Sequence, residues 1–286
     1  MSPAPRFLVV DGYPKPSRDE FDTAGMTLSF DLYANMLRRH VPEAEVAVWL
    51  PSDTAELPDA QGVETYAGVL WTGCNLTIYH DHDERVTRQI ALSKRAYEVG
   101  VPQFGSCWGL QMAAFCAGGE VKPNPKGREM GLARKVFITD EGRDHPMMRG
   151  KPPVFCGFIS HDDQVTALPP GAVWLASNDW TRIQAIAVTH QKGTFWAVQY
   201  HPEYDLADLA ALIVVREPKL VREKFFSGHD DLMAYVDKLR ALAADPTRKD
   251  LRWQLDIDDD VLDIDRRQLE FKNFIDVVVR PRLGSQ

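Results

Sequence analysis

The sequence predicts an α/β protein in which a mostly parallel, doubly wound sheet lies between two layers of helices, with a helical extension at the C-terminus. Short apolar segments alternate with segments of helical periodicity in the first half of the chain, the order that gives parallel strands joined by crossover helices. A buried strand, a tight turn and a helix follow one another over residues 101–117. Beyond residue 205, apolar residues recur mainly at helical spacing. We therefore expect a three-layer domain at 1–205 and a helical extension at 206–286.

Length and composition narrow the class of protein. A chain of 286 residues with 44% hydrophobic and 26% charged residues is typical of a soluble globular protein. Its net charge of −8 argues against a nucleic-acid surface, and no apolar run is long enough to span a membrane. The N-terminal stretch Met1–Arg6 has no signal-peptide pattern. The four cysteines lack metal-ligand spacing, so we expect free thiols in a cytoplasmic protein.

The elements of the first half follow from periodicity and from turn residues. Two prolines make a long loop the expectation for Tyr13–Thr23. Helices are expected where apolar residues recur every three or four positions, at Met26–His40, Arg85–Val99 and Leu110–Ala117. Strands are expected where short apolar runs are rich in β-branched and aromatic residues, at Arg6–Gly12, Glu45–Leu50, Tyr66–Gly73 and the segment beginning at Val101.

The second half is rich in strands up to residue 200 and helical beyond it. The expected strands are Glu120–Lys122, Leu132–Ile138, Val154–Ile159, Val173–Ser177, Ile183–Val188 and Phe195–Tyr200. The expected helices are Asp205–Val215, Lys219–Phe226, His229–Leu242 and Arg266–Val279.

Cys107 lies at the apex of the turn between the strand and helix of residues 101–117, in the pattern Gly105-x-Cys107-x-Gly109. A nucleophile on such an elbow points out of the sheet, and a thiol at a helix N-terminus has its thiolate favoured by the helix dipole. The alternative is a buried cysteine of an α/β core. Taken alone, the segment gives the two interpretations similar weight.

His201 and Glu203 supply a base and a carboxylate to orient it. His201 follows the expected strand Phe195–Tyr200, and Pro202 favours an extended backbone at His201. Side chains two apart on extended backbone point to the same side, so Glu203 can hold the imidazole in one tautomer. With Cys107 these residues form a candidate nucleophile, base and orienting acid. Without Cys107, a loop would be the better interpretation.

Two acidic clusters are interpreted as helix starts and solvated loops rather than metal sites. The segment His80–Glu84 precedes an expected helix, where acidic residues favour the N-terminus. The run Asp256–Asp260, followed by Asp263 and Asp265, lies in a charged stretch of the extension. We predict no metal and no cofactor.

Four segments together resemble the class I, triad-type glutamine amidotransferases, including the amidotransferase domain of GMP synthetases. They are Gly105-Ser-Cys-Trp-Gly-Leu-Gln111, Gly127-Arg-Glu-Met-Gly131, Ser160-His-Asp-Asp-Gln-Val165 and Val198-Gln-Tyr-His-Pro-Glu203. The resemblance extends over roughly residues 6 to 205 and implies the flavodoxin-like fold of that family, with the catalytic triad Cys107, His201 and Glu203.

The resemblance also implies further site residues. The backbone N–H groups of Gly73 and Trp108 would form the oxyanion hole, and Gln111, Ile159 and Ser160 would contact the substrate. His161 is expected to be structural. The chain departs from the family's glycine-rich loop at Gly73-Cys-Asn-Leu76, which puts the shape of that loop in doubt. Asn75 is more simply a turn residue than an added donor.

The expected reaction is hydrolysis of a γ-glutamyl amide through a γ-glutamyl thioester, with glutamine or another γ-glutamyl compound as substrate. The chain has no P-loop, so released ammonia would pass to a separate synthetase subunit. A stand-alone γ-glutamyl hydrolase or peptidase is the alternative, and a non-catalytic regulatory module of the same fold is a second. Homodimer formation is left open.

Overall fold

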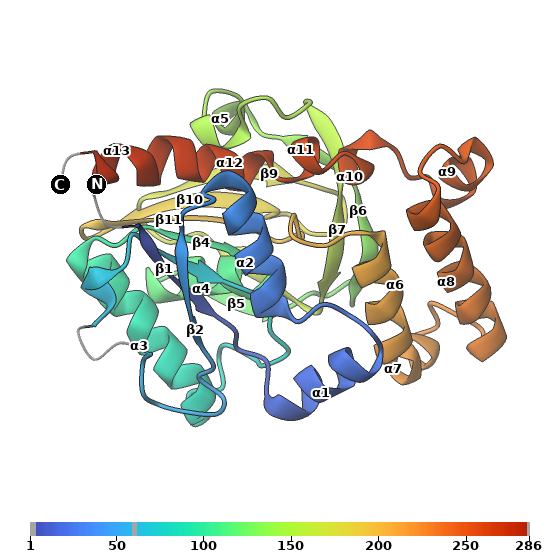
Figure 1. The fold of residues 1–286 in the computed structure, drawn as a ribbon, viewed down its shortest axis with the longest axis horizontal. Coiled ribbons are helices and arrows are strands. Elements are labelled where there is room, and N and C mark those ends of the chain that lie inside the picture. The colour runs from blue at the N-terminus through green and yellow to red at the C-terminus, as the bar shows by residue number, and fades with distance from the viewer. Residues whose placement is uncertain (1–3, 59–61, 285–286) are drawn as a thin grey trace.

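The computed structural model describes residues 4–58 and 62–284, so the outermost residues of both predicted domains, including Met1–Pro3 of the N-terminal stretch, lie outside it. Nine strands of the described residues form one sheet in the order β2-β1-β3-β4-β11-β10-β9-β6-β7 (Figure 1). The strands are β1 Arg6–Val10, β2 Glu45–Trp49, β3 Gly68–Trp71, β4 Gln103–Ser106, β6 Glu129–Ile138, β7 Val154–His161, β9 Ala172–Ser177, β10 Ala185–His190 and β11 Gly193–Val198.

The first five strands of this order are parallel to one another. The remaining four continue the sheet through antiparallel pairs, so β10 and β6 run against the other strands. A separate antiparallel pair joins β5, Glu120–Pro123, to β8, Asp163–Ala167. The predicted mostly parallel α/β sheet is confirmed, with an antiparallel extension at one edge.

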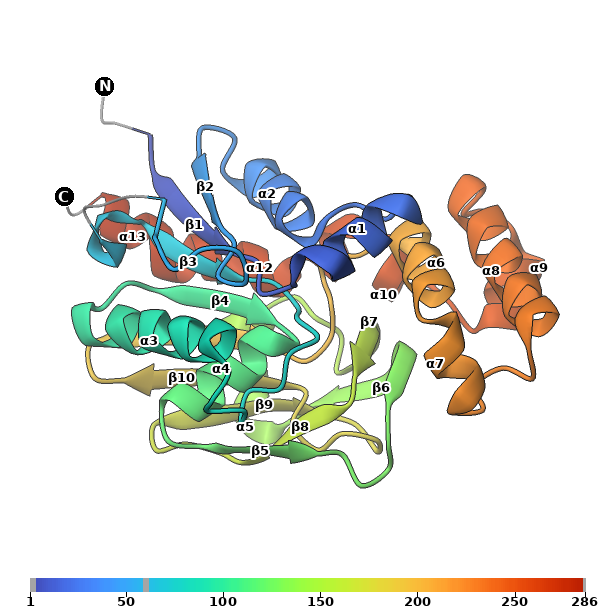
Figure 2. The same cartoon turned by 90° about the horizontal axis from the view of Figure 1, so that it is seen from below.

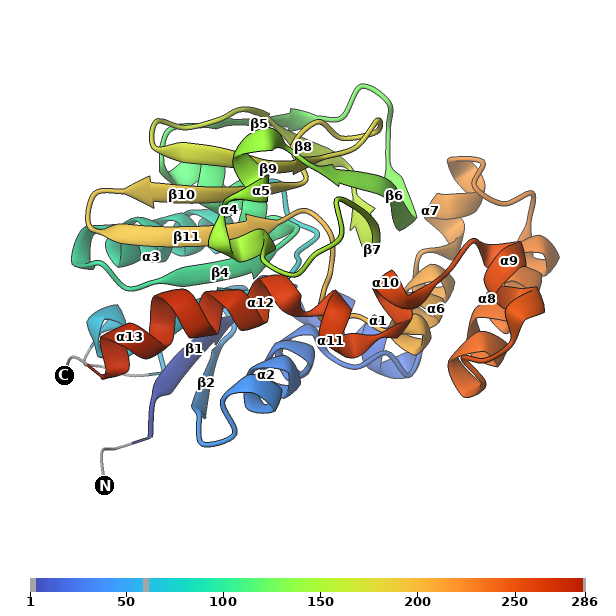
Figure 3. The ribbon, with the colours of Figure 1, turned by 90° about the horizontal axis from the view of Figure 1, so that it is seen from above.

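Helices cover both faces of the sheet, as Figures 2 and 3 show from opposite sides. One face carries α3, Glu84–Val99, and α4, Trp108–Cys116, packed on side chains such as Trp71 and Phe195. The other carries α2, Ser29–His40, and the last helical segment of the chain, packed on Phe104 and Trp196. That segment comprises α12, Leu269–Phe274, a π-helical turn, Ile275–Val279, and α13, Arg280–Leu283. The short helix α5, Asp140–Arg143, contacts β9.

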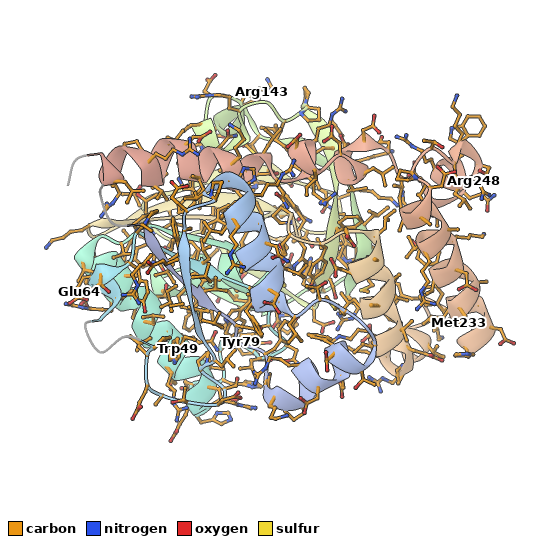
Figure 4. The ribbon with its side chains drawn as sticks, viewed as in Figure 1. Trp49, Glu64, Tyr79, Arg143, Met233 and Arg248 are labelled. Atoms are coloured by element: carbon orange, nitrogen blue, oxygen red, sulfur yellow. The ribbon has the colours of Figure 1, made fainter. Side chains whose placement is uncertain are left out.

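The rest of the helical extension forms a lobe beside β6 and β7 (Figure 1). In Figure 4, Met233 and Arg248 mark this lobe on α8 and at the start of α9. Its helices are α6 Leu206–Val215, α7 Glu217–Arg222, α8 His229–Ala244, α9 Lys249–Leu255, α10 Asp259–Leu262 and α11 Ile264–Arg267. The domain boundary after residue 205 stays a prediction.

Two local interpretations of the sequence have clear outcomes. The expected loop at Tyr13–Thr23 is wrong, because Lys15–Thr23 forms helix α1; Pro16 lies in its first turn, where a missing N–H breaks no intrahelical bond. The helix-start interpretation of His80–Glu84 is confirmed, since Asp83 caps α3 by accepting a hydrogen bond from the N–H of Arg85. Among helices of the described residues, none combines the length and apolar character of a membrane span.

Candidate active site

Cys107 occupies the elbow between β4 and α4. Its backbone has φ of +51° and ψ of −94°, a conformation that is strained for a residue with a side chain. Its N–H donates to the carbonyl of Val198 at the end of β11, which holds the turn against the neighbouring strand. The thiol Sγ lies 3.6 Å from the carbonyl oxygen of Ser160. The predicted elbow is confirmed.

The two glycines beside Cys107 are there because the elbow packs tightly against β3. A Cβ on Gly105 would lie 2.7 Å from the Cα of Gly109 and 2.8 Å from the Cβ of Trp71. A Cβ on Gly109 would lie 3.2 Å from the same Trp71 atom. Any side chain at Gly105 would therefore push α4 away from the sheet and move Cys107 with it.

His201 and Glu203 lie where the sequence predicts, just beyond β11. The Nδ1 atom of His201 is 2.6 Å from Oε1 of Glu203, and Cys107 lies close enough to the imidazole to raise its pKa. The ring stacks on Tyr204 with centroids 4.1 Å apart, which fixes its plane. Tyr204 comes from the turn that precedes α6. Nucleophile, base and carboxylate thus converge.

A buried chain of hydroxyl groups supports the carboxylate. Ser106 donates to Oε1 of Glu203 at 2.9 Å, and Tyr33 donates to Oγ of Ser106 at 2.8 Å. All three side chains are buried. Ser106 is the last residue of β4, directly before the elbow residue Cys107. Tyr33 comes from α2, so this helix contributes to the site from the face of the sheet opposite to α4.

Electrostatics favour a charged imidazole at this position. Burial opposes protonation of His201, but the charge of Glu203 and hydrogen bonds with Cys107 and Glu203 outweigh it and raise its pKa to about 10. The pKa of the thiol of Cys74, by contrast, is raised by burial. An imidazolium in contact with a thiol favours the thiolate, so the arrangement is suited to nucleophilic attack by Cys107.

A pocket of about 320 Å³ opens above Cys107. The predicted contacts Gln111 and Ser160 line it, whereas Ile159 is fully buried behind the pocket wall and does not. The rest of the lining is Tyr13, Cys74, Asn75, Leu76, Thr77, Arg128, His161, Asp162, Asp163, Arg216 and Lys219.

Of the two predicted oxyanion-hole residues, Gly73 is next to the imidazole of His201 and Trp108 directly follows Cys107. A Cβ on Gly73 would lie 2.9 Å from Cε1 of His201 and 3.4 Å from Oη of Tyr13, so Gly73 borders the site. Trp108 is the first residue of α4, and its N–H has no acceptor within the helix. Assignment of these N–H groups to an oxyanion hole stays a prediction.

His161 belongs to a buried network that ties β7 to β6. Its Nε2 is 3.1 Å from Oε2 of Glu129, and its Nδ1 is 2.7 Å from the carbonyl oxygen of Asp163. Glu129 also accepts from Asn178, Thr181 and Gln184. These contacts agree with the expected structural role of His161.

Several residues at the site were given no individual role by the sequence. Arg128 and Lys219 both contact Asp162 at the pocket, and Arg216 comes from the junction of α6 and α7. For Ser106, the sequence shows only that a hydroxyl side chain directly precedes Cys107. The cations come from a loop and from the helical extension, where charged residues are common.

The geometry defines an α/β protein with a cysteine elbow and an adjacent histidine–glutamate pair. The model of the glutamine amidotransferase class-I family matches residues 33–214. The chain is 31% identical over 281 residues to a gamma-glutamyl-L-1-hydroxyisopropylamide hydrolase from a Pseudomonas species, covering 96% of this chain and 94% of that protein.

Two further relatives are more distant. The chain is 29% identical over 202 residues to a glutamine-hydrolyzing GMP synthase from Thermomicrobium roseum, with 70% of this chain and 35% of that protein covered. A crystal structure of a glutamine amidotransferase from Thermotoga maritima superposes with a TM-score of 0.66 at 17% identity, covering 94% of this chain and 98% of that one. The chain therefore belongs to the class-I glutamine amidotransferase family. The predicted family, its fold and its status as an enzyme are confirmed.

Proposed function

We propose that the protein hydrolyses a γ-glutamyl amide, with Cys107 as nucleophile, His201 as general acid and base, and Glu203 as the group that orients His201. The observation that carries the proposal is the convergence of these three side chains, of which Cys107 lines a polar pocket. Membership of the class-I family and the similarity to the Pseudomonas hydrolase support it.

Acylation is the first step. The thiolate of Cys107 attacks the amide carbonyl carbon, and a C–S bond forms as negative charge develops on the carbonyl oxygen. The N–H groups of Gly73 and Trp108 would stabilise that charge, typically by about 3 kcal/mol for one donor. His201 gives its proton to the departing nitrogen, the C–N bond breaks, and an amine or ammonia leaves a γ-glutamyl thioester.

Hydrolysis of the thioester completes the cycle. Neutral His201 takes a proton from water, and the hydroxide attacks the thioester carbonyl carbon. The C–S bond then breaks, releasing the γ-carboxylic acid, which loses its proton to water, and restoring the thiolate beside an imidazolium. Glu203 keeps Nδ1 of His201 protonated throughout, so that Nε2 serves both proton transfers.

Stand-alone hydrolysis is the function we favour. The Pseudomonas hydrolase corresponds to this chain over nearly the full length of both proteins, whereas the chain spans only about a third of the Thermomicrobium GMP synthase. Similarity to GMP synthases supports a second candidate, an amidotransferase subunit that passes ammonia to a separate synthetase. Glutaminase activity that rises on adding a co-purifying synthetase would favour the amidotransferase subunit. Full activity of the purified chain alone on γ-glutamyl amides would favour stand-alone hydrolysis.

The nucleophile is tested by replacing Cys107 with alanine. We expect this variant to lose turnover of glutamine and γ-glutamyl amides, and a glutamine-like electrophile to label the wild type once, at Cys107, as located by peptide mass spectrometry. Cys156→Ala is the matched control, because burial raises the pKa of this thiol and it lies outside the pocket. Labelling of Cys74, Cys116 or Cys156 in place of Cys107 would refute the assignment.

A further inference from the structure

The arginine and lysine side chains that line the proposed active-site pocket are paired with carboxylates, with one exception among the described residues. Arg128 bonds with Asp162 and lies 3.0 Å from Glu223, and Lys219 lies 2.7 Å from Asp162. These two cations are therefore neutralised by carboxylates of the chain itself. Within residues 4–58 and 62–284, no carboxylate lies at ion-pair distance from Arg216, although it lines the same pocket as Cys107.

Arg216 is held over the pocket by packing rather than by an ion pair. Its guanidinium carbon lies 5.8 Å from the centre of the Phe21 ring, within the range of a cation–π contact. Phe21 in turn packs edge-on against Tyr13 with centroids 4.9 Å apart. The backbone of Arg216 is fixed between two helices, because this residue is both the C-cap of α6 and the N-cap of α7. The cation is thus presented by the scaffold.

The charge of Arg216 acts close to the reacting groups. Burial raises the pKa of Tyr13, and the nearby positive charge of Arg216 opposes that rise while the charge of Cys107 adds to it. Tyr13 therefore lies within electrostatic reach of both residues. Its hydroxyl is also next to Gly73, which borders His201. An anionic group of a substrate bound at Cys107 would meet an unpaired guanidinium in the lining of the same pocket.

We propose that Arg216 binds a carboxylate of the γ-glutamyl substrate and so determines substrate specificity. The inference rests on the proposed function. Arginine is suited to the task because its planar guanidinium donates two parallel hydrogen bonds to a carboxylate. Every γ-glutamyl compound with a free α-carboxylate carries that group four bonds from the amide carbon. A γ-glutamyl peptide carries another on its leaving group.

Three substrates separate these two sources of a carboxylate. γ-Glutamyl ethylamide has only the α-carboxylate, its α-methyl ester has none, and γ-glutamylglycine has one on each side of the amide. For Arg216→Gln we expect kcat/KM on the ethylamide to fall about 10- to 100-fold, mainly through KM, the loss typical of a charged hydrogen bond. The wild type and the variant should hydrolyse the ester equally, and Arg216→Lys should recover part of the loss.

The comparison has controls for fold and for the proposed reaction. Arg222→Gln removes an exposed arginine from the same helical segment, outside the pocket, and should behave as the wild type. A loss confined to γ-glutamylglycine would assign Arg216 to the leaving-group carboxylate. Equal activity of wild type and Arg216→Gln on all three substrates, or an equal loss on all three, would overturn carboxylate binding. In both cases continued dependence of wild-type turnover on Cys107 would leave the proposed function standing.

Discussion

Tyr33, Ser106, Glu203 and His201 form a continuous buried chain of hydrogen bonds, and His201 at its end is influenced by the charge of Cys107. Each donor in the chain points toward the carboxylate, so Glu203 accepts hydrogen bonds from Ser106 on one side and from His201 on the other. In a site shielded from water these contacts act with little solvent screening. The physical role of Glu203 is therefore to keep a positive charge on His201 where water alone would not stabilise it.

The pH dependence of stability tests that role. His201 has its pKa raised from 6.5 to about 10 in the folded protein, so its protonation stabilises the fold fully below pH 6.5, and this contribution is lost as the pH rises toward 10. We expect the wild-type free energy of unfolding, measured by urea denaturation, to fall between pH 6.5 and 10. In Glu203→Gln the slope over the same range should be much shallower, because the attracting charge is gone.

Kinetics of the same variant separate orientation from charge. Glu203→Gln should lower kcat about 10²- to 10⁴-fold, the range expected when the orienting acid of a triad is replaced by its amide. If the free energy of unfolding had the same pH dependence in the wild type and in Glu203→Gln from pH 6.5 to 10, Glu203 would not be the group that keeps His201 protonated. Unchanged kcat would remove Glu203 from the mechanism altogether.

At the level of residues, the sequence predicted those site members whose local pattern carries the information. Cys107 lies between two glycines on a strand-to-helix turn, and Glu203 lies two residues after His201 on extended backbone. Tyr33 and Arg216 could not be predicted in this way. Tyr33 reaches Ser106 across 73 positions, and helical periodicity marks it only as a core residue. Arg216 lies among charged residues that give no sign of which one will remain unpaired.

The segment that carries His201 is held at both flanks by the last helices of the chain. Tyr200 donates from its hydroxyl to Glu270 in α12, and Arg267 of α11 donates from Nε to the carbonyl of Pro202. Glu270 is also paired with the buried Lys151 at 3.0 Å. The element that forms one outer layer of the sandwich therefore also positions the strand end that carries His201.

Tyr200→Phe tests this positioning. Removing the hydroxyl takes one donor from the buried carboxylate of Glu270, so we expect the free energy of unfolding to fall by about 1.5–3 kcal/mol. We also expect kcat to fall while KM is kept, because His201 is displaced but the pocket is not. Tyr235→Phe in α8 is the control, since its hydroxyl has no hydrogen bond with another described residue. If Tyr200→Phe kept both kcat and stability, α12 would have no part in placing His201.

At the level of elements, periodicity predicted where most helices and strands lie but not what they pack against. Helix α1 was missed because prolines indicate a loop by frequency, while Pro16 is harmless in a first turn. The segment Arg266–Val279 was expected to be helical, and its apolar residues indicate a buried face. The spacing does not predict that this face covers Phe104 and Trp196 of the sheet, because local periodicity carries no information on packing partners far apart in the sequence.

The whole molecule is a sandwich closed by the end of its own chain. On one side of the sheet the covering helices α3 and α4 come from the first 116 residues. On the other side α2 shares the surface with residues 269–283, which lie more than 200 positions further on (Figure 3). Folding of the sheet core and docking of the chain end are therefore expected to be one cooperative event rather than two.

A chain that stops at residue 268 should consequently lose far more than a peripheral helix. Phe271, Phe274, Ile275 and Val279 are each at most 1% exposed, and burying such side chains contributes about 1.5–3 kcal/mol apiece, or roughly 6–12 kcal/mol together. This range is comparable with the total stability of a typical domain, about 5–15 kcal/mol. We expect the truncated chain to lack the cooperative urea transition of the full chain and to lose γ-glutamyl hydrolysis with it.

Point substitutions in the full chain test the same packing. Phe274→Ala should lower the free energy of unfolding by about 3–5 kcal/mol. Trp253→Ala, at a side chain 81% exposed on α9, should change it by no more than about 0.5 kcal/mol. If the truncated protein unfolded in urea with the same midpoint and slope as the full chain, the sheet face beneath α12 would not need this helix for its stability.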